Sequence, residues 1–543
     1  MMKLKVRTTR GGATGFLKPL DLLLVVVMVM TFMLAGCGDA TPGATATLPS
    51  TTATTSSGAF LPQYWPTTGW RTSTPEEQGV DSQQLLTTLN HIEQDNVNVR
   101  TLTVTRNGYI LLEAANQPFT LNMPYQVYSV TKSVMGALVG IALHEGFLKD
   151  VNQKVLSFFP ERTIANRDQN KEAITIEDLL TMRPGLDCGD DKLNGAMEAS
   201  KDWIQFTLDL PMASAPGQKL VYCTAGVHLL SAILTKATGM PTSVYAQSRL
   251  FDPLGIASAD VKWDKDPQGI TIGGYGISMK PRDMTKFGLL YLAGGKWESK
   301  QVVPEDWVTA STRVHATGEN QKDYGYLFWV YPTHFAAEGL GEQMIKVVKS
   351  RNMVVVMTSA IDWHKGPVIL RLLEDYIIPA AKSDKPLSAN PVALQSLRDK
   401  VAYLNNPLKP VQALPPIARS ISGKAFSLPD NPVGWKNLTF NFAEGKAEVQ
   451  INVVQQNGAD QATASVAVGL DNVYRIETLE GGGFAARRAY WADEKTLVVQ
   501  QIQSAPEIQE TEARLEFSGD RLKLHVEEKV FGTYSYDFEG TIS

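Results

Sequence analysis

The chain has 543 residues and a formal net charge of −5, with 51 basic and 56 acidic side chains. Because the balance is nearly even and no basic patch stands out, nucleic acid is not expected as a partner. The chain is also too long for one ordinary hydrophobic core, so two or three folded units are expected.

The first 36 residues have the organisation of an export signal. Five basic side chains lie within residues 3–18, a nearly pure apolar stretch occupies residues 22–35, and Cys37 follows Gly36. A charged start, a short apolar run and a small-residue exit are typical of a secretory signal peptide. An uncleaved membrane anchor is the alternative, but these 14 apolar residues fall short of the roughly 17 that a span needs.

The run Leu34-Ala35-Gly36-Cys37 resembles the cleavage site of bacterial lipoproteins, in which the cysteine becomes the lipidated first residue. The resemblance implies a signal peptide over residues 1–36 and a lipid anchor on Cys37. Thr, Ala, Ser, Pro and Gly dominate residues 40–57, so we expect a flexible tether over residues 37–60. The expected location is the bacterial cell envelope, outside the cytoplasm, with the membrane as a partner through the anchor.

The first elements of the folded body are a hairpin and a buried helix. Apolar runs on either side of Asn107-Gly108 predict a β-hairpin over residues 101–114, because this pair favours a tight hairpin turn. Residues 129–145 carry Ala, Gly, Val and Leu on most faces, which indicates a buried helix. A capping-box pattern predicts a short helix over residues 177–182.

Further helices and strands follow in an order that favours an α+β domain. Helices are expected over residues 225–238, 281–292 and 368–381, and strands over residues 324–331, 343–349 and 353–359. Helices enclosed between an early hairpin and late antiparallel strands are typical of α+β folds. We therefore expect one α+β domain over residues 61–382.

The composition changes after this domain. Six prolines punctuate residues 383–420, which we interpret as a linker with one helix near residues 395–404. Residues 421–543 show period-two apolar patterns separated by Gly and Asp clusters. This pattern predicts a small C-terminal antiparallel β domain, without a catalytic cluster and with an unknown partner.

The strongest chemical signal is the pattern Ser129-Val130-Thr131-Lys132 at the start of a predicted helix. Residues three apart share a helix face, so the Lys132 amine can lie beside the Ser129 hydroxyl. A serine nucleophile needs such a base, and the helix N-terminus favours an alkoxide. A buried lysine can lose its proton and serve as that base. The alternative is a lysine whose charged end reaches solvent.

This pattern, followed by an apolar helix, resembles the serine β-lactamase and penicillin-recognising family over about residues 70–381. The likeness is nearest to class C β-lactamases, DD-peptidases and related esterases, and it implies a β-lactamase/transpeptidase-like fold with an acylated Ser129. Tyr222-Cys223-Thr224 stands where the family has its Y-x-N motif. The resemblance implies that Tyr222 relays protons with Lys132, and a nearby ammonium favours a phenolate.

The segment Ala337-Glu338-Gly339-Leu340 resembles the A-x-G variant of the family's K-T-G strand. The resemblance implies that Gly339 lets the backbone approach the substrate, and that the Leu340 and Ser129 N–H groups hold the oxyanion. A plain glycine-rich loop before a hairpin is the alternative.

Two departures from the family pattern concern substrate recognition. Thr224 replaces an asparagine whose amide contacts the substrate, and a threonine is shorter with a single hydroxyl. The lysine of K-T-G, which pairs with the carboxylate of β-lactams and peptide C-termini in relatives, is absent. Both departures favour simple esters or amides over anionic β-lactams.

Cys188 and Cys223 are the only cysteines after Cys37. An even pair in an exported chain indicates one disulfide, and two separate buried thiols are the alternative. In the resembled fold both cysteines lie near the rim of the site, which favours the disulfide. The seven histidines show no paired ligand spacing, and no phosphate loop or dinucleotide motif occurs, so neither a metal nor a cofactor is expected.

The sequence therefore predicts a membrane-tethered serine hydrolase that acts through an acyl-enzyme on an ester or amide in a small-molecule or peptide substrate. A true β-lactamase or DD-carboxypeptidase is the alternative among enzymes. The alternative from another class is a β-lactam or peptidoglycan sensor, or a binding lipoprotein, without turnover.

Overall fold

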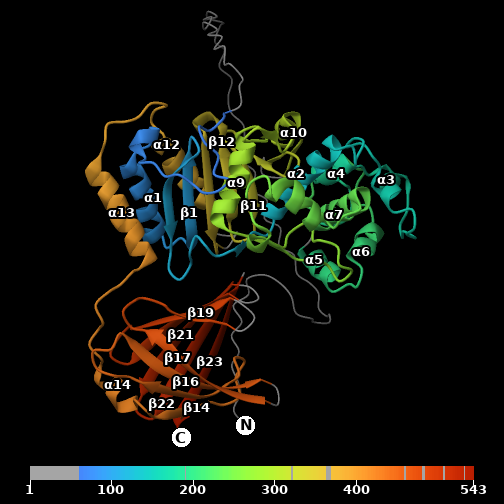
Figure 1. The fold of residues 1–543 in the computed structure, drawn as a ribbon. Helices are drawn as coiled ribbons and strands as arrows, with labels where there is room; N and C mark the ends of the chain where they lie inside the picture. Colours follow the sequence, from blue (N-terminus) through green and yellow to red (C-terminus); the bar gives the residue numbers. More distant parts are fainter. Residues whose placement is uncertain are drawn as a thin grey trace, which may run out of the picture.

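The structure, a computed structural model, describes residues 60–189, 191–318, 322–361, 368–457, 460–479, 483–504, 508–530 and 532–543. Figure 1 shows an upper α+β domain and a lower domain of β-strands. Cys37, the apolar run over residues 22–35 and the expected tether before residue 60 lie outside the described residues. Within the described ranges, no helix is long and apolar enough to cross a membrane.

An eight-stranded antiparallel sheet forms the centre of the α+β domain, in the order β2-β1-β13-β12-β11-β10-β9-β8. Its strands are β1 (Val99–Arg106), β2 (Tyr109–Ala115), β8 (Ala316–Thr317), β9 (Asp323–Tyr324), β10 (Trp329–Val330), β11 (Phe335–Gly339), β12 (Gln343–Val348) and β13 (Met353–Ser359). Because β1 pairs with β13, strands from the start and the end of this domain are neighbours in the sheet, next to the edge strand β2.

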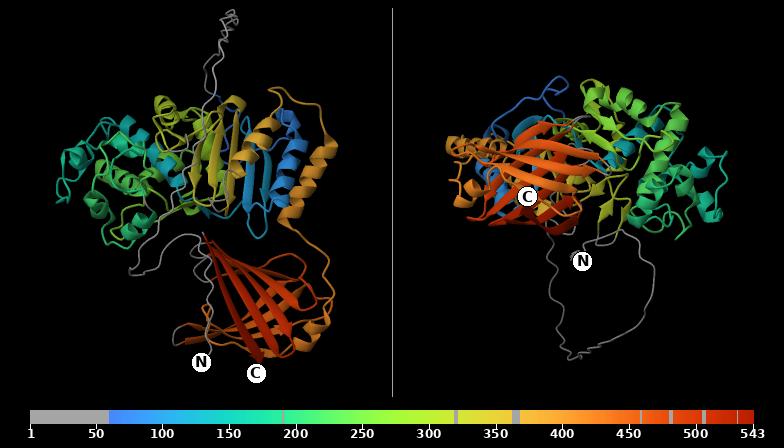
Figure 2. Two further views of the ribbon diagram at one scale, coloured as in Figure 1. Left: turned by 180° about the vertical axis from the view of Figure 1, so that it is seen from behind. Right: turned by 90° about the horizontal axis from the view of Figure 1, so that it is seen from below.

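Helices cover both faces of this sheet, as Figures 1 and 2 show. One face carries α1 (Ser82–Gln94), α11 (Val368–Arg371), η8 (Leu372–Ile377) and α12 (Ile378–Ala380). The other face carries α2 (Val130–His144) and α9 (Pro281–Leu292).

Shorter elements extend the domain beyond the sheet. The helices are η1 (Glu76–Gln78), η2 (Val155–Phe158), α3 (Gln169–Ala173), α4 (Ile176–Leu180), α5 (Asp191–Glu198), α6 (Trp203–Asp209), α7 (Thr224–Thr238), α8 (Thr242–Ala246), η3 (Gln247–Phe251), η4 (Ser258–Asp260), α10 (Glu305–Ser311) and η6 (Lys349–Arg351). The short strands are β3 (Tyr125–Gln126), β4 (Lys262–Trp263), β5 (Ile277–Met279), β6 (Lys296–Trp297) and β7 (Lys300–Gln301). The small sheet β3-β5-β4 leads directly into α2 and so positions its first turn.

The central sheet is buried on both faces. In β13, Met353, Val355 and Met357 belong to the core under α1 and α12, whereas Val354 and Val356 belong to the larger core around α2 and α9. Successive side chains of a strand point to opposite faces, so a strand buried on both faces reads as an unbroken apolar run. This explains why β12 and β13 were predictable although their polar and apolar residues do not alternate.

One predicted strand, over residues 324–331, is wrong. The structure has two short strands there, β9 and β10, which pair with each other around a turn. The turn residue Leu327 has a φ of 60°. Its N–H donates to Leu180 O at 3.0 Å, and the Tyr326 N–H donates to Ser311 O at 3.0 Å. Hydrogen bonds to distant segments thus take these backbone groups out of the sheet.

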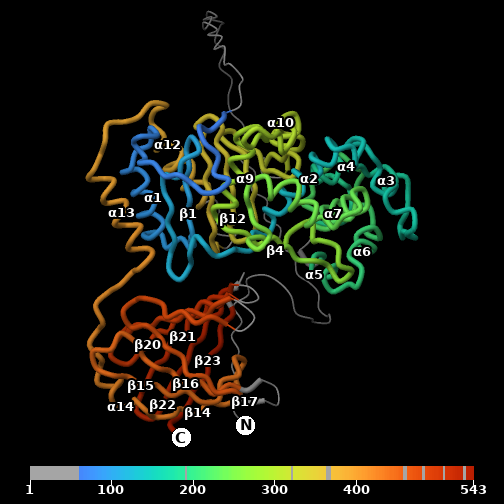
Figure 3. Tube along the Cα trace, viewed as in Figure 1, coloured from blue at the N-terminus to red at the C-terminus, as the bar shows by residue number. Residues whose placement is uncertain are grey.

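The predicted helix near residues 395–404 is α13 (Pro391–Asn405), which Asn390 caps with its side chain. It packs on α1 and β2, and Leu397 joins the core under α1. The tube in Figure 3 continues from α13 to α14 (Pro416–Ile421). Ala418 and Ile421 belong to the core of the second domain, so these two helices pack on different domains.

The second domain is a β-barrel, in which the described residues form ten strands and β17 meets β19 through a parallel bridge. Its strands are β14 (Ala425–Ser427), β15 (Trp435–Asn441), β16 (Glu448–Asn457), β17 (Asp460–Gly469), β18 (Arg475–Thr478), β19 (Phe484–Trp491), β20 (Thr496–Ser504), β21 (Ile508–Ser518), β22 (Arg521–Val530) and β23 (Gly532–Ile542). The structure thus confirms the expected fold class, an α+β domain followed by an antiparallel β domain.

The two domains contact each other at the segment that leads into α2. One apolar cluster spans them and consists of Phe119, Tyr125, Tyr474, Ala486 and Ile502. Arg100 pairs with Glu510 of the barrel at 3.2 Å, and Gln117 Oε1 accepts a hydrogen bond from the Tyr474 N–H at 3.0 Å. Because Tyr125 lies in β3, the barrel packs on the strand that precedes Ser129.

Candidate active site

Ser129 lies at the first turn of α2, which begins at Val130. The residue before it, Tyr128, has a φ of 46°, an uncommon conformation for a residue with a side chain. Two hydrogen bonds hold this turn, from the Val130 N–H to Val127 O at 3.1 Å and from the Thr131 N–H to Tyr128 O at 3.0 Å. The turn leaves the Ser129 side chain partly exposed at the start of the helix.

Lys132 lies directly beside Ser129. Its Nζ atom is 2.9 Å from Ser129 Oγ and donates to Gly274 O at 2.8 Å. The residue is only 1% exposed, so the alternative of a lysine reaching solvent is wrong. Burial lowers the pKa of Lys132 from its ordinary value to about 7. A large share of the molecules therefore carries a neutral amine near neutral pH, which is the form that accepts a proton.

Tyr222 completes this group from the segment before α7. The Lys132 Nζ atom lies 4.8 Å from the centre of the Tyr222 ring. Burial raises the pKa of the Tyr222 hydroxyl, and a hydrogen bond with Ser129 opposes this less strongly. The expected phenolate is therefore wrong, because burial outweighs the opposing interaction. Tyr222 is a protonated phenol that can donate a proton.

A group of aromatic side chains lies beside Ser129 and includes Tyr222. The rings of Tyr222 and Trp329 stack with centroids 5.8 Å apart, and Tyr324 meets Trp329 edge-on at 4.8 Å. The Lys322 Nζ atom lies 5.6 Å from the centre of the Trp329 ring. Aromatic rings bury large apolar areas, so this group suits an apolar part of a substrate.

The carbonyl that holds Lys132 belongs to a glycine for a steric reason. A Cβ atom on Gly274 would lie 2.6 Å from Thr224 Cγ2 and 3.0 Å from Thr224 O. Only a residue without a side chain lets this backbone approach the start of α7. Thr224 is itself buried, and its methyl group lies against Gly274.

The strand expected to hold the oxyanion also approaches Ser129. A Cβ atom on Gly339, the last residue of β11, would lie 3.0 Å from Ser129 N and 2.2 Å from Val127 O. The strand therefore passes directly beside the start of α2. Leu340 follows, with its side chain 42% exposed. Its role in the oxyanion hole stays a prediction.

Glu338 is a charged residue at this site that the sequence analysis left without a role. It accepts hydrogen bonds from Lys346 Nζ at 2.7 Å and from the Tyr331 hydroxyl at 2.9 Å. Its negative charge also contributes to the raised pKa of Tyr222. The middle position of the K-T-G strand thus carries a carboxylate, which the sequence itself shows at Glu338.

A disulfide joins Cys188 to Cys223, with Cα atoms 5.3 Å apart. Cys223 caps α7, because its Sγ atom accepts a hydrogen bond from the Gly226 N–H at 3.3 Å. The bond therefore ties the segment after α4 to the residue that follows Tyr222. Among the described residues, no group of His, Cys, Asp or Glu side chains is suited to hold a metal ion.

Comparisons with known proteins find several relatives of this chain. The 6-aminohexanoate-dimer hydrolase of Paenarthrobacter ureafaciens is 25% identical over 272 residues, 47% of this chain and 67% of that protein. A beta-lactamase of Escherichia coli is 28% identical over 146 residues, 26% of this chain and 36% of that protein. The solved octameric penicillin-binding protein homologue from Pyrococcus abyssi is 14% identical over 84% of this chain and 99% of its own, with a TM-score of 0.45.

The fold and the comparisons together define a β-lactamase-like hydrolase. The beta-lactamase family model matches residues 91–364, about half of the chain. The chain belongs to the beta-lactamase family, which confirms the resemblance that rested on Ser129, Lys132 and Tyr222.

The pKa of Lys132 predicts how hydrolysis depends on pH. If neutral Lys132 is the base, kcat/KM for a neutral ester rises about tenfold per pH unit below a midpoint near 7 and is level above it. The measurement is a kcat/KM profile from about pH 5 to about pH 9. Lys132→Arg is the control, because a guanidinium stays protonated and should abolish activity throughout. A profile that falls with rising pH would contradict this assignment.

Removing the disulfide should destabilise the α+β domain. In the chain-entropy model, a bond that spans 35 residues contributes about 3–4 kcal/mol, so Cys188→Ser with Cys223→Ser should lower the free energy of unfolding by about that amount. Urea unfolding of both proteins measures the difference. Reduced wild-type protein, as a matched control, should unfold like the double variant. Equal midpoints for oxidised wild type and variant would refute the prediction.

Proposed function

We propose that this protein is a serine hydrolase that cleaves an ester or amide through an acyl-enzyme. The observation that carries the proposal is the distance of 2.9 Å between Ser129 Oγ and the buried Lys132 Nζ, whose pKa is lowered to about 7. A hydroxyl within hydrogen-bond reach of a neutral amine is an activated nucleophile. The helix N-terminus at Ser129 adds a positive potential that favours the developing alkoxide.

The proposed reaction has two halves. Lys132 takes the Ser129 proton while Oγ attacks the substrate carbonyl, and the N–H groups of Ser129 and Leu340 hold the resulting oxyanion. The protonated Tyr222 hydroxyl donates to the leaving group as the carbonyl reforms, and Lys132 restores that proton. Water then attacks the acyl carbonyl while the neutral Lys132 amine takes its proton through the Tyr222 hydroxyl. As the tetrahedral intermediate collapses, Lys132 returns that proton to Ser129 Oγ, which releases the acid and the free serine.

We propose neutral substrates, or substrates with an apolar group next to the carbonyl. The stacked, partly exposed rings of Tyr222 and Trp329, with the buried Tyr324 behind them, favour an apolar group. Where relatives of this family present a cation on this strand, this chain has Ala337 followed by Glu338, and Glu338 is paired with Lys346. These two residues therefore offer no attraction to an anionic substrate. The Thr224 hydroxyl also offers fewer hydrogen bonds than an asparagine amide.

Two other functions remain as alternatives. A true β-lactamase or DD-carboxypeptidase would use the same nucleophile on an anionic substrate. A sensor or binding lipoprotein would acylate Ser129 without releasing the product. Burst kinetics with no steady state would identify the sensor.

We also propose that the protein is exported and anchored in the cell envelope through a lipid on Cys37. The proposal rests on the basic start, the apolar run over residues 22–35 and the small residues before the cysteine. The disulfide between Cys188 and Cys223 supports it, because such bonds persist mainly in oxidising compartments. The function of the barrel domain, and its partner, are left open.

Ser129→Ala tests the proposed nucleophile. The value of kcat/KM toward a p-nitrophenyl ester should fall at least about a thousandfold, because the substitution removes the hydroxyl that forms the proposed acyl-enzyme. The variant should also lose labelling by a fluorophosphonate probe, while its thermal unfolding midpoint stays close to that of the wild type. Turnover retained by the purified variant would contradict the proposed mechanism.

Substrate choice tests the two departures from the family pattern. Two missing contacts of about 1.5–3 kcal/mol each lower specificity for an anionic β-lactam by roughly a hundredfold to ten-thousandfold, since about 1.4 kcal/mol is tenfold. Short neutral esters should therefore have higher kcat/KM than penicillins on the same preparation, and Thr224→Asn should narrow the gap. If the wild type cleaves a penicillin or cephalosporin with a higher kcat/KM than the ester, the predicted substrate preference is refuted. The assignment of Ser129 as the nucleophile would still stand.

Cys37→Ala tests the anchor. The variant should carry no lipid label and should either leave the membrane fraction or accumulate as a precursor, because the proposed lipidation needs the cysteine thiol. The Ser129→Ala variant is the control and should remain in the membrane fraction. Unchanged lipid labelling of Cys37→Ala rules the anchor out.

A further inference from the structure

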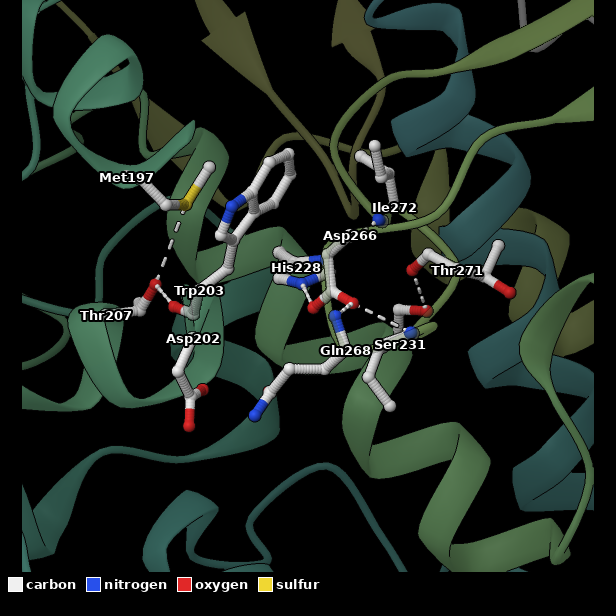
Figure 4. Close-up of polar contacts among 12 residues, drawn as sticks. Met197, Asp202, Trp203, Thr207, His228, Ser231, Asp266, Gln268, Thr271 and Ile272 are labelled. Carbon is white, nitrogen blue, oxygen red and sulfur yellow. Dashed lines mark hydrogen bonds and ion pairs between the residues drawn. The ribbon is translucent and has the colours of Figure 1, made fainter. Parts of the chain in front are cut away.

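The helical part of the α+β domain contains a buried histidine–carboxylate pair that the proposed mechanism does not use. His228 Nε2 lies 3.1 Å from Asp266 Oδ2, and the two side chains are 1% and 0% exposed. Figure 4 shows the pair enclosed between Trp203 and Ser231. The Trp203 ring packs edge-to-face with the imidazole, with ring centroids 5.4 Å apart. Burying polar groups this deeply lowers the stability of the fold unless each of them has a hydrogen-bond partner. The hydrogen bonds of His228 and Asp266 therefore show which backbone groups the pair keeps in place.

The hydrogen bonds fix which ring nitrogen carries the proton. His228 Nδ1 accepts a hydrogen bond from the Gly273 N–H at 3.2 Å, so Nδ1 has no proton. Nε2 must then carry the proton and donate it to Asp266 Oδ2. The other carboxylate oxygen, Oδ1, accepts from the Gln268 N–H at 2.9 Å and from the Ile270 N–H at 2.8 Å. Both carboxylate oxygens of Asp266 therefore accept hydrogen bonds within the protein.

The pair leads directly to the catalytic base. Gly273, held by His228 Nδ1, precedes Gly274, whose carbonyl accepts the hydrogen bond from Lys132 Nζ at 2.8 Å. The Gly273 backbone lies close against α7, because a Cβ atom there would meet Val227 O at 2.4 Å. Hydrogen bonds thus connect Asp266 to His228 and His228 to the Gly273 N–H. The peptide backbone leads from there to the Gly274 carbonyl, which is hydrogen-bonded to Lys132 and so connects the pair to Ser129.

We propose that His228 and Asp266 are positioning residues for the Lys132 base. Asp266 selects the imidazole tautomer, His228 holds the Gly273 N–H, and the Gly274 carbonyl is thereby fixed as the acceptor that aims Lys132 at Ser129. The proposal rests on the proposed function, because it needs Lys132 to act as a base. It assigns a role in the reaction to two residues that never touch the substrate.

Asp266→Asn is the sharpest test, because it changes one atom and keeps the shape. The asparagine oxygen has to stay on the Gln268 and Ile270 N–H groups, so its NH2 group faces His228 Nε2. Nε2 must then accept, the proton moves to Nδ1, and Nδ1–H points at the Gly273 N–H. Two donors facing each other should push Gly273 and Gly274 away from Lys132.

The expected result is a fall in kcat toward a p-nitrophenyl ester of about tenfold to a hundredfold, since a small misplacement of a catalytic group has effects of this size. KM should stay within about twofold, because no substrate contact changes. Fluorophosphonate should still label Ser129 completely, but more slowly. The ¹⁵N shifts of the His228 ring should report the proton on Nε2 in the wild type and on Nδ1 in the variant.

Two amide substitutions at His228 form a matched pair. His228→Asn puts an oxygen where Nδ1 was, so it keeps an acceptor for Gly273 and should retain most of kcat. His228→Gln puts its amide at the Nε2 position and should lose kcat like Asp266→Asn. In the His228→Asn background, Asp266→Asn should cause no further loss, because no tautomer remains to be selected.

Ser231→Ala separates positioning from general packing. Ser231 lies one turn along α7 from His228 and donates to Thr271 O in the same segment at 2.6 Å. Its loss should lower the thermal unfolding midpoint but leave kcat within about twofold, since the bond does not reach Gly274.

The outcomes distinguish this proposal from the proposed function. Suppose that the wild type is labelled at Ser129 and active, and that the Asp266→Asn variant folds and has an unchanged kcat. This result overturns the positioning role and leaves the proposed function intact. Equal losses in His228→Asn and His228→Gln overturn the positioning role as well, because they indicate packing. A wild type in which Ser129 neither labels nor turns over an ester overturns the proposed function, and the positioning proposal with it.

Discussion

The burial of one amine is the constraint on which the site depends. Lys132 is 1% exposed in an apolar helix, and burial lowers its pKa to about 7 from an ordinary 10.5. Between these two values the unfolded chain binds more protons than the folded protein, so the free energy of unfolding rises with pH across this window. Below pH 7 the folded protein carries the full destabilisation of a buried ammonium. The burial that lowers stability is also what supplies a neutral base.

The parts of the site that lie on one short stretch of chain were predictable from the sequence. Ser129 and Lys132 are three residues apart at the start of a helix, and the helix follows from its own composition. The hairpin of β1 and β2 is set by the two residues at its turn. Tyr222 and the strand ending at Gly339 were found only through their resemblance to a family, because no local rule connects them to Ser129.

The parts that the sequence analysis missed depend on contacts between distant segments. Gly274 lies 142 residues from Lys132, and nothing in its neighbourhood indicates that its carbonyl holds an amine. The state of Tyr222 was wrongly predicted because the ammonium was considered without the burial that raises the pKa of the hydroxyl. The turn at Leu327 was missed because its backbone partner lies in α4. In each case the residue type was visible in the sequence, but the contacts that surround the residue in the fold were not.

The choice of a backbone carbonyl to hold Lys132 affects how this site can vary. The Gly274 oxygen is part of the main chain, so no substitution at that position removes it. An alanine scan of the residues around Ser129 would therefore never detect this acceptor, except as a steric clash at Gly274 with Thr224. The acceptor is encoded elsewhere, by the packing of α7 and the loop after β4. Substitutions in those elements can therefore change the environment of the Lys132 amine while Ser129, Lys132 and Tyr222 stay the same.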